Sequence, residues 1–472
     1  MTTGKALDKM TRRDFIGTAT AAMAISGLGA APAADEGLPA YYGEHIAKVA
    51  ARLRALSKSC DDAFFFITDL HFPYNRCVSG RILAKLVAET DVKKVLCGGD
   101  IPEAFGGKAS VDSAIEAYRS KWVDAVERAG GEFYPAKGNH DFTIRDSSKA
   151  QSGFTYSGKE AHDILMDTAA VNANAVTNKN DPEACYYYVD FPKAKVRYIV
   201  ADTTDSIATD RTFWAVKYGM GERQLNWLAE KALLTIPRGW AALTMQHIPM
   251  TDVVSGESRN KQLFKPWRTL LETYQNRSKA LVGGRAYDFS KAEGILLCNL
   301  TGHEHSERQT FQCGLWHITQ PCDAAYSDYI VGSTPWCANL PKKAKGTIFE
   351  QTFDAVHIDR RNNLLHFTRI GGGGDRTVHL KPLRVTPGER AKLPELAMSA
   401  CGADVKWGCY DADRTQQERN PANKYQHFFR YFNGVVEISA DGTLTAKKSG
   451  EAVVLAMRPD FRKEIFGVEV RS

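Results

Sequence analysis

The chain has 472 residues, of which 43% are hydrophobic and 25% are charged. This composition is typical of a globular protein with a sizeable core, and the length indicates two or three domains. The formal net charge of +6 is too small to indicate a nucleic-acid-binding protein, although it does not oppose an anionic substrate.

The N-terminus has the features of an export signal. Arg12 and Arg13 precede a weakly apolar stretch, and residues 31–33, Ala-Pro-Ala, fit a cleavage site with small residues. Residues 1–33 therefore resemble a bacterial twin-arginine signal, which implies the twin-arginine export machinery as a partner and a periplasmic or extracellular location. The alternative is a chance arginine pair before an ordinary secretion signal. The apolar stretch is too short for a permanent span, and we expect no membrane span after signal cleavage.

Residues 34–60 are expected to form a linker and a helix, and a regular alternation follows. The predicted strands are 63–68, 93–97 and 132–136, and the predicted helices between them are 79–89 and 111–129. This β-α-β-α-β order predicts a largely parallel sheet with helices outside it.

Two longer insertions interrupt the later strands. Residues 142–183 are polar and carry one predicted helix near 159–170, and an insertion of this length often forms a lid or a substrate wall. An amphipathic helix is expected from residue 221, with Leu225, Leu228 and Ala232 on its core face. The second insertion covers residues 251–292. The remaining predicted strands are 185–190, 195–202, 239–246, 295–300, 314–319, 347–358 and 363–370.

Polar motifs follow five of these strands. They are Asp69-Leu70-His71, Gly98-Gly99-Asp100, Gly138-Asn139-His140-Asp141, His247 and Gly302-His303-Glu304-His305. Because an α/β sheet binds its ligands beyond the carboxyl ends of its strands, we expect these side chains to meet. We take seven of them as possible metal ligands with nitrogen or oxygen donor atoms, namely Asp69, His71, Asp100, Asn139, His247, His303 and His305.

The number and type of these donors indicate two metal ions. One divalent ion takes roughly four to six ligands, so seven donors with a carboxylate able to bridge suit a pair of ions. No thiolate is among them, which favours Mn, Zn or Fe over a soft-metal site.

In this order, the five motifs resemble the calcineurin-like metallophosphoesterase superfamily over residues 61–376. The resemblance implies an α/β fold, in which a β-sandwich of mixed sheets is flanked by helices, and an enzyme that hydrolyses phosphate esters. A hydroxide between the two ions would attack phosphorus, and His140, oriented by Asp141, would protonate the leaving oxygen. The implied ligand sets are Asp69, His71, Asp100 and His305 for one ion, and Asp100, Asn139, His247 and His303 for the other.

The motifs do not decide the substrate class, and they leave two other functions open. Phosphomonoesters and phosphodiesters are both compatible with the motifs. One alternative is a surface or periplasmic binding protein on a degenerate metallophosphoesterase scaffold, which the complete donor set argues against. The other is a nuclease-type phosphodiesterase, which the mild charge disfavours. Four arginines are candidates for a substrate phosphate, although each also suits a surface salt bridge: Arg76, Arg145, Arg211 and Arg376.

The pattern changes near residues 382–387, and only short strands follow. Residues 434–446 predict a hairpin with an Asp-Gly turn, and residues 438–454 resemble a bacterial immunoglobulin-like (Ig-like) domain of group 2. We therefore expect residues 61–382 to form the metallophosphoesterase domain and residues 383–472 an Ig-like β-sandwich, which would bind a cell-surface glycan or a protein.

Ten cysteines are compatible with an oxidising compartment. Cys97, Cys185 and Cys298 lie in apolar runs and are expected to be plain buried side chains. The others could form disulfides, with a connectivity that the sequence does not assign: Cys60, Cys77, Cys313, Cys322, Cys337, Cys401 and Cys409.

Overall fold

The computed structural model describes most of the chain from residue 37 onward. The described residues are 37–102, 107–141, 143–145, 153–155, 158–205, 218–250, 264–325, 343–394, 405–412, 415–420, 423–431 and 433–472. Residues 1–33, where the export signal is predicted, lie outside this set. Pro39–Ser472 form one compact unit.

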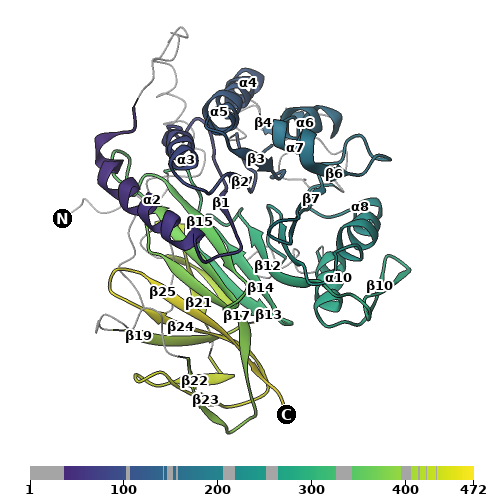
Figure 1. Ribbon diagram of the computed structural model, residues 1–472, viewed down its shortest axis with the longest axis vertical. Helices are drawn as coiled ribbons and strands as arrows, with labels where there is room; N and C mark the ends of the chain where they lie inside the picture. Colours follow the sequence, from purple (N-terminus) through teal and green to yellow (C-terminus); the bar gives the residue numbers. More distant parts are fainter. Residues whose placement is uncertain are drawn as a thin grey trace, which may run out of the picture. The chain divides into compact units, whose positions relative to one another are not determined.

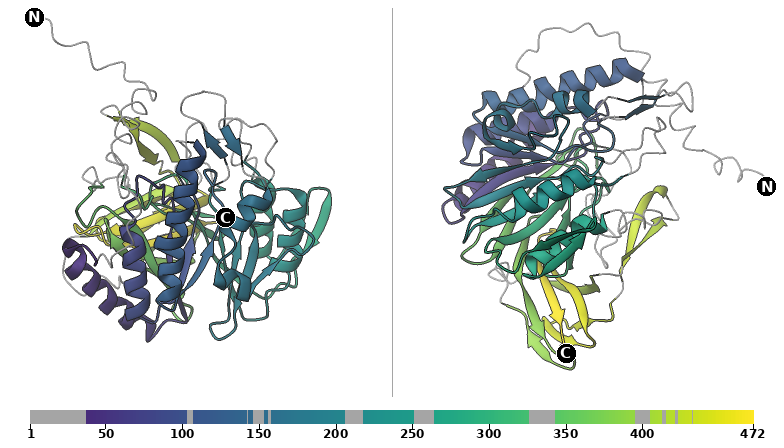
Figure 2. Two further views of the ribbon diagram at one scale, coloured as in Figure 1. Left: turned by 90° about the horizontal axis from the view of Figure 1, so that it is seen from above. Right: turned by 90° about the vertical axis from the view of Figure 1, so that its right-hand side faces the viewer.

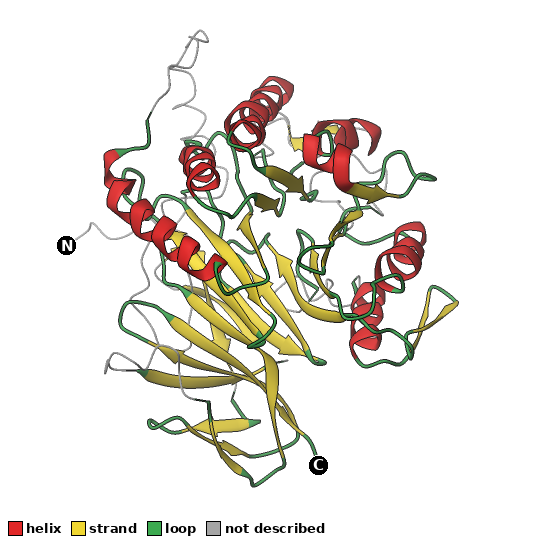
Figure 3. Cartoon of the chain, viewed as in Figure 1, coloured by secondary structure: helices red, strands yellow, loops and turns green. Residues whose placement is uncertain are grey.

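Two large mixed β-sheets with helices around them form the main part of this unit (Figures 1 and 3). The larger sheet has nine strands in the order β19 (Lys406–Asp411), β24 (Gly450–Met457), β25 (Lys463–Val470), β17 (Arg376–Val385), β16 (Leu364–Gly371), β15 (Thr352–Asp359), β1 (Asp62–Ile67), β2 (Lys94–Cys97) and β3 (Glu132–Pro135). The second sheet has seven strands in the order β13 (Arg308–Gln312), β14 (Leu315–Thr319), β12 (Ile295–Thr301), β9 (Ala241–Met245), β8 (Val196–Val200), β7 (Tyr187–Phe191) and β6 (Ala175–Thr177).

The predicted α/β class is confirmed. The strands β1, β2 and β3 pair in parallel, as their alternation with helices predicts. In the second sheet, β12 pairs in parallel with both β9 and β14. Parallel strands end at the same edge of a sheet, so the loops that follow them are brought together.

Helices flank the sheets, and α3 and α5 run side by side outside the larger one (Figure 2). They are α2 (Gly43–Ser57), α3 (Val78–Glu89), α4 (Gly107–Ala117), α5 (Asp124–Arg128), α6 (Gly158–Leu165), α7 (Ala169–Asn174), α8 (Glu222–Trp227) and α10 (Lys265–Gln275), with the short 3₁₀ helix η1 (Ala40–Tyr42) and the π-helical turns η2 (Tyr118–Val123) and η4 (Leu228–Leu233). Among the described residues, no helix combines the length and the hydropathy that a membrane crossing requires.

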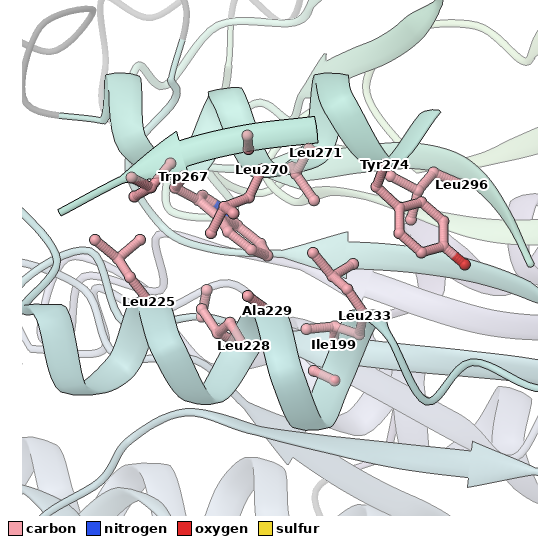
Figure 4. Packing of buried hydrophobic residues seen from close by; sticks show 14 of the residues in the cluster. Ile199, Leu225, Leu228, Ala229, Leu233, Trp267, Leu270, Leu271, Tyr274 and Leu296 are labelled. Carbon is pink, nitrogen blue, oxygen red and sulfur yellow. The ribbon is translucent and has the colours of Figure 1, made fainter. Parts of the chain in front are cut away.

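One hydrophobic cluster supports the strands that lead to the later motifs. Leu225 and Leu228 are buried as predicted, and they face α10 across the cluster (Figure 4). On the α10 side, Trp267 and Leu271 have no exposed surface. Each such side chain contributes about 1.5–3 kcal/mol when buried. The cluster includes residues of β9 and β12, so it also positions the loops that carry His247 and His303.

The insertion at residues 142–183 is more structured than the sequence indicates. It holds the hairpin of β4 (Thr143–Arg145) and β5 (Gly153–Thr155) in addition to α6, α7 and β6. The two helices span the region where a single helix is predicted. The role of this segment as a lid stays a prediction.

The C-terminal strands continue the larger sheet. β25 pairs in parallel with β17 and antiparallel with β24. The three short strands β18 (Arg390–Lys392), β23 (Thr443–Ala446) and β22 (Val436–Ile438) form a separate sheet, and its Leu444 packs in one cluster with Val454 and Val468. A last hairpin joins β20 (Thr415–Asn420) to β21 (Asn423–Tyr431).

The expected domain boundary at residue 382 falls inside β17. The strands on its two sides share one sheet, and contacts place both regions in one compact unit. Two β-layers are present beyond this point, but one of them is an extension of the larger sheet. The assignment of residues 383–472 to an independent Ig-like domain stays a prediction.

Eight cysteines lie among the described residues, and all eight are free thiols. The cysteines that could have paired do not do so in this part of the chain. Cys337 and Cys401 lie outside the described residues.

Candidate metal centre

The five predicted motifs meet beyond the carboxyl ends of strands from both sheets. The loops after β1, β2 and β3 carry Asp69-Leu70-His71, Gly98-Gly99-Asp100 and Gly138-Asn139-His140-Asp141. The loops after β9 and β12 carry His247 and Gly302-His303-Glu304-His305. Backbone hydrogen bonds join these loops to one another: Asp69 N donates to Gly99 O at 2.9 Å, and Gly302 N donates to His247 O at 2.9 Å.

One group of donors consists of Asp69, His71, Asp100 and His305, whose ligand atoms all lie within 4.8 Å of one another. His305 Nε2 is 3.1 Å from Asp69 Oδ1 and 2.9 Å from His71 Nε2. Two imidazole nitrogens and a carboxylate oxygen thus converge on one point. This geometry suits a divalent cation with nitrogen and oxygen ligands.

A second group consists of Asp100, His247 and His303. His247 Nε2 lies 3.0 Å from Asp100 Oδ2. Asn139 lies one residue before His140, and its Oδ1 is buried with no hydrogen-bond partner. A buried amide oxygen without a partner is costly unless it has another ligand, and a cation would satisfy it. Asp100 belongs to both groups, which is the arrangement of a bridging ligand.

Hydrogen bonds behind the donors fix their orientation. His247 Nδ1 lies 2.8 Å from Gly98 O, and a proton on Nδ1 that is donated to this carbonyl leaves the Nε2 lone pair facing Asp100. Thr68 Oγ1 donates to Asp69 Oδ2 at 2.8 Å, and the backbone N–H of His303 donates to the same carboxylate at 3.1 Å.

The backbone of these loops adopts strained conformations. Five donor residues have φ in the left-handed region, namely Asp69 (57°), His71 (45°), Asp100 (56°), His303 (71°) and His305 (55°). Such angles cost about 1–3 kcal/mol each and persist only where the surrounding structure imposes them, often at functional sites.

Two glycines allow the loops to approach the carboxylates closely. A Cβ on Gly138 would overlap with Asp100 Oδ1, and a Cβ on Gly302 would lie 2.5 Å from Asp69 Oδ2. The glycine in each motif is thus a local sequence signal of the site.

The electrostatics of the donors favour positive charge at the centre. Burial raises the pKa of Asp100, but the imidazoles of His247 and His140 outweigh it and hold that pKa below its ordinary value. Burial lowers the pKa of His247, yet the Asp100 carboxylate raises it to about 9. Burial lowers the pKa of His305. Two buried carboxylates therefore attract cations, and metal ions can take the place of the protons on the imidazoles.

His140 lies at the edge of both groups. Its Nε2 is 3.8 Å from Asp100 Oδ2, and its ring meets that of His71 edge to face at 5.1 Å between centroids. Its backbone N–H donates to Asp100 Oδ1 at 2.8 Å. The side chain is 15% exposed, so a substrate can reach the imidazole.

The Asp141 carboxylate binds the backbone of two motif loops. Its carboxylate accepts the backbone N–H groups of Gly138 at 2.6 Å, Ile101 at 2.7 Å and Asp100 at 3.0 Å. Burial and the neighbouring Asp100 carboxylate raise the pKa of Asp141 to about 6, against the effect of these N–H donors. The side chain links the Asp100 loop to the loop after β3. Its orientation of His140 stays a prediction.

The candidate substrate arginines are not gathered at the centre in the part of the chain that the structure describes. Arg76 is half exposed and forms an ion pair with Glu350. Arg376 is fully buried and donates to Asp354 and Glu307, so its role is structural and the prediction of a phosphate contact was wrong. Arg145 is described only as part of the backbone of β4, and Arg211 lies outside the described residues.

Sequence reasoning missed two features next to the centre. Cys322 is fully buried, and its thiol donates to Asp69 O at 3.2 Å; its Sγ also lies within 4.8 Å of ligand atoms of His71 and His305. Lys137 Nζ forms a buried ion pair with Asp202 at 2.6 Å, directly before Gly138. The position of Lys137 in the motif loop is a local signal, whereas nothing near Cys322 in the sequence indicates its place.

The family comparison agrees with this geometry. The model of the calcineurin-like phosphoesterase family matches residues 63–307, which is just over half of the chain and includes all seven donors and His140. No curated protein sequence matches the chain.

Several solved structures are similar to the chain at low identity. A dimetal phosphatase from Danio rerio is 14% identical, with 67% of this chain and 98% of that chain covered and a TM-score of 0.43. The structure of PhoD is 11% identical, with 67% and 71% covered and a TM-score of 0.35. GAP50, the anchor in the inner membrane complex of Plasmodium, is 13% identical, with 65% and 84% covered and a TM-score of 0.34. Family membership therefore depends on the family model.

Proposed function

The chain belongs to the calcineurin-like phosphoesterase family and is a hydrolase of phosphate esters, and on that premise we propose that it cleaves phosphomonoesters or phosphodiesters at a dinuclear metal centre. The observation that carries the proposal is that two groups of nitrogen and oxygen donors share Asp100. The donor types favour Mn, Zn or Fe.

The residues of the chain have distinct tasks in this reaction. When bound, the two ions supply positive charge that stabilises the transition state and a water of lowered pKa. The carboxylates of Asp69 and Asp100 are buried, so they would bind the ions in a place that bulk solvent does not reach. His140, which is partly exposed beside Asp100, donates a proton from its imidazole to the leaving oxygen. Asp141 keeps Asp100 in place through the backbone amides.

Metal-dependent hydrolysis of two simple esters tests this function. The full chain would be treated with chelator, reloaded with Mn²⁺, Zn²⁺ or Fe²⁺, and assayed on 4-nitrophenyl phosphate and bis(4-nitrophenyl) phosphate. We expect metal to restore hydrolysis of at least one ester, and the relative rates indicate the preference for monoesters or diesters. Asp100→Asn should abolish the restored rate, whereas Asp163→Asn, at an exposed ion pair on α6, should not. A metal-loaded chain that hydrolyses neither ester would favour the binding-protein alternative.

We also propose that the protein is exported by the twin-arginine route. The support is the Arg12-Arg13 pair before an apolar stretch and a small-residue cleavage site. Replacing both arginines by lysine should keep the chain in the cytoplasm, as fractionation and immunoblotting would show. Unchanged export of that variant would indicate an ordinary secretion signal.

A further inference from the structure

Three side chains with different donor chemistry lie together outside the candidate metal centre. Cys60, Asp359 and His366 place a thiol sulfur, a carboxylate oxygen and an imidazole nitrogen within 4.8 Å of one another. Zinc takes this combination of ligands in proteins. We propose that these residues form a third metal site, for Zn²⁺ or a similar divalent cation, which is separate from the dinuclear centre and independent of the proposed function.

The backbone brings the three residues together from different elements. Cys60 follows α2, and its N–H donates to Leu56 O at 3.0 Å. The next residue begins the pairing of the chain with β15, because Asp61 N donates to Ile358 O at 2.8 Å. Cys60 is therefore held beside the end of β15, where Asp359 lies.

Strand register places Asp359 and His366 on one face of the larger sheet. His366 in β16 is the partner of His357 in β15, two residues before Asp359. Residues two apart on a strand share a face, so Asp359 and His366 are diagonal neighbours. This arrangement of strands is fixed by the β15–β16 hairpin and does not depend on a metal.

Hydrogen bonds orient the two strand donors. The backbone N–H of Asn362 donates to Asp359 Oδ1 at 2.9 Å and its side-chain amide donates to Oδ2 at 2.7 Å. A carboxylate has about four lone-pair sites, so it can still bind a cation. Thr377 Oγ1 lies 3.4 Å from His366 Nδ1, and a proton on Nδ1 leaves the Nε2 lone pair for a metal.

The distances leave room for an ion between the donors. His366 Nε2 lies 4.0 Å from Asp359 Oδ2, which is beyond hydrogen-bonding range. Zn–N and Zn–O bonds of about 2.1 Å each bridge this gap after a small closure. Cys60 and His366 are partly exposed, so a water molecule can supply a fourth ligand.

The charge of the cluster balances that of a divalent cation. Burial and the Asp359 carboxylate raise the pKa of the Cys60 thiol to about 11, so the thiol stays protonated without a cation. Binding of a metal releases that proton, and thiolate and carboxylate together then neutralise the two positive charges. The ion would tie the end of α2 to the β15–β16 hairpin.

The proposed site lies at the opposite end of β1 from Asp69. Cys60 precedes β1 and Asp69 follows it, and a strand of this length spans roughly 20 Å. Occupation of the site should therefore leave ester hydrolysis unchanged.

Cobalt spectroscopy of the full chain tests the proposal, because Co²⁺ bound to a thiolate has a charge-transfer absorption in the near ultraviolet. With Co²⁺ in excess of the dinuclear centre, we expect this absorption in the wild type and its loss in Cys60→Ser, together with about one bound Co²⁺ fewer per chain. His366→Gln should weaken Co²⁺ binding at this site. Cys313→Ser, at another partly exposed free thiol, and Cys322→Ser should keep the absorption.

The controls separate this site from the dinuclear centre. Cys60→Ser changes one atom at a partly exposed position, and its circular dichroism and its nitrophenyl-ester hydrolysis should match those of the wild type. Absence of the absorption in the wild type, or its survival in Cys60→Ser, would overturn the proposal. Loss of the absorption in Cys322→Ser alone would place a thiolate ligand at the dinuclear centre.

Discussion

At the scale of single residues, Gly138 sets how closely the loop after β3 approaches the shared carboxylate. A side chain at this position would overlap with Asp100 Oδ1, so Gly138→Ala should displace the bridging ligand. We expect weaker metal binding and a rate about a hundredfold lower, which is the typical effect of a small misplacement in an active site. Metal analysis measures the bound metal, and nitrophenyl-ester kinetics measure the rate.

Gly43→Ala is a suitable control for this substitution. A Cβ there meets nothing within 4 Å, and the residue begins α2. Metal content and rate should stay at the wild-type values. If Gly138→Ala behaves like this control, close approach to Asp100 is not a requirement of the centre.

His140 should matter most where the leaving group needs a proton. His140→Ala should lower the rate on an alkyl phosphate ester by roughly two to four powers of ten, the range typical of lost acid catalysis. The loss on a nitrophenyl ester should be clearly smaller, because nitrophenolate leaves without a proton. Equal losses on both esters, with metal content intact, would assign His140 to charge stabilisation on the phosphoryl oxygens.

Asp141 should behave as a positioning residue for Asp100. Asp141→Asn replaces an acceptor oxygen by an N–H₂ group that faces backbone donors, so at least one of the N–H groups of Gly138, Asp100 and Ile101 loses its partner. We expect a loss of about 1–3 kcal/mol in the free energy of unfolding and weaker metal binding, measured by urea denaturation and metal titration.

The leaving-group dependence distinguishes this role from the one that the motif implies. Asp141→Asn should slow alkyl and nitrophenyl esters by similar factors. A variant that keeps its metals and slows mainly the alkyl ester would show that Asp141 acts through His140 after all.

At the scale of elements, the strands and the motifs after them could be predicted because their signals are local. Apolar runs of four to six residues identify β1, β2 and β3, and a glycine-containing turn follows β2 and β3. The pairing of β17 with β25 could not be predicted, because it joins residues far apart in the sequence, such as Arg376 and Lys463, and depends on contacts that no short pattern encodes.

This pairing determines the effect of truncation that we expect. A chain that ends at residue 381 loses β25 and β24 and leaves β17 as an incomplete edge of the larger sheet. Lys463 of β25 also forms a buried ion pair with Glu307, two residues after His305. We expect this chain to be insoluble or to melt at a much lower temperature, as expression and circular dichroism would show.

A chain that ends at residue 470 keeps all of β25 and is the matched control. It should fold and hydrolyse esters like the full chain. A soluble, active chain ending at residue 381 would instead establish the C-terminal strands as an independent domain.

At the scale of the whole molecule, the donor residues of the metal centre could be predicted from the sequence, but the residues that surround them could not. Six of the seven expected donors, all except Asn139, fall in the two groups of ligand atoms. They lie in short motifs, so residue type and order were sufficient to indicate them. Arg376 and Cys322 are two residues whose surroundings could not be predicted from the sequence. An arginine near a glycine-rich turn fits a phosphate contact until tertiary structure encloses it with Asp354 and Glu307, and a cysteine reaches the Asp69 loop only through the fold.

Metal stoichiometry, followed together with activity, tests whether the centre works with two ions. The chelator-treated chain would be titrated with Mn²⁺ or Zn²⁺ while bound metal and hydrolysis of a nitrophenyl ester are recorded, with Cys60→Ser as the background so that only the dinuclear centre is counted. We predict that activity reaches its maximum at about two ions per chain and that Asp100→Asn lowers the occupancy of both positions. Full activity in the metal-free chain, or with a single bound ion, would show that hydrolysis does not need a dinuclear centre.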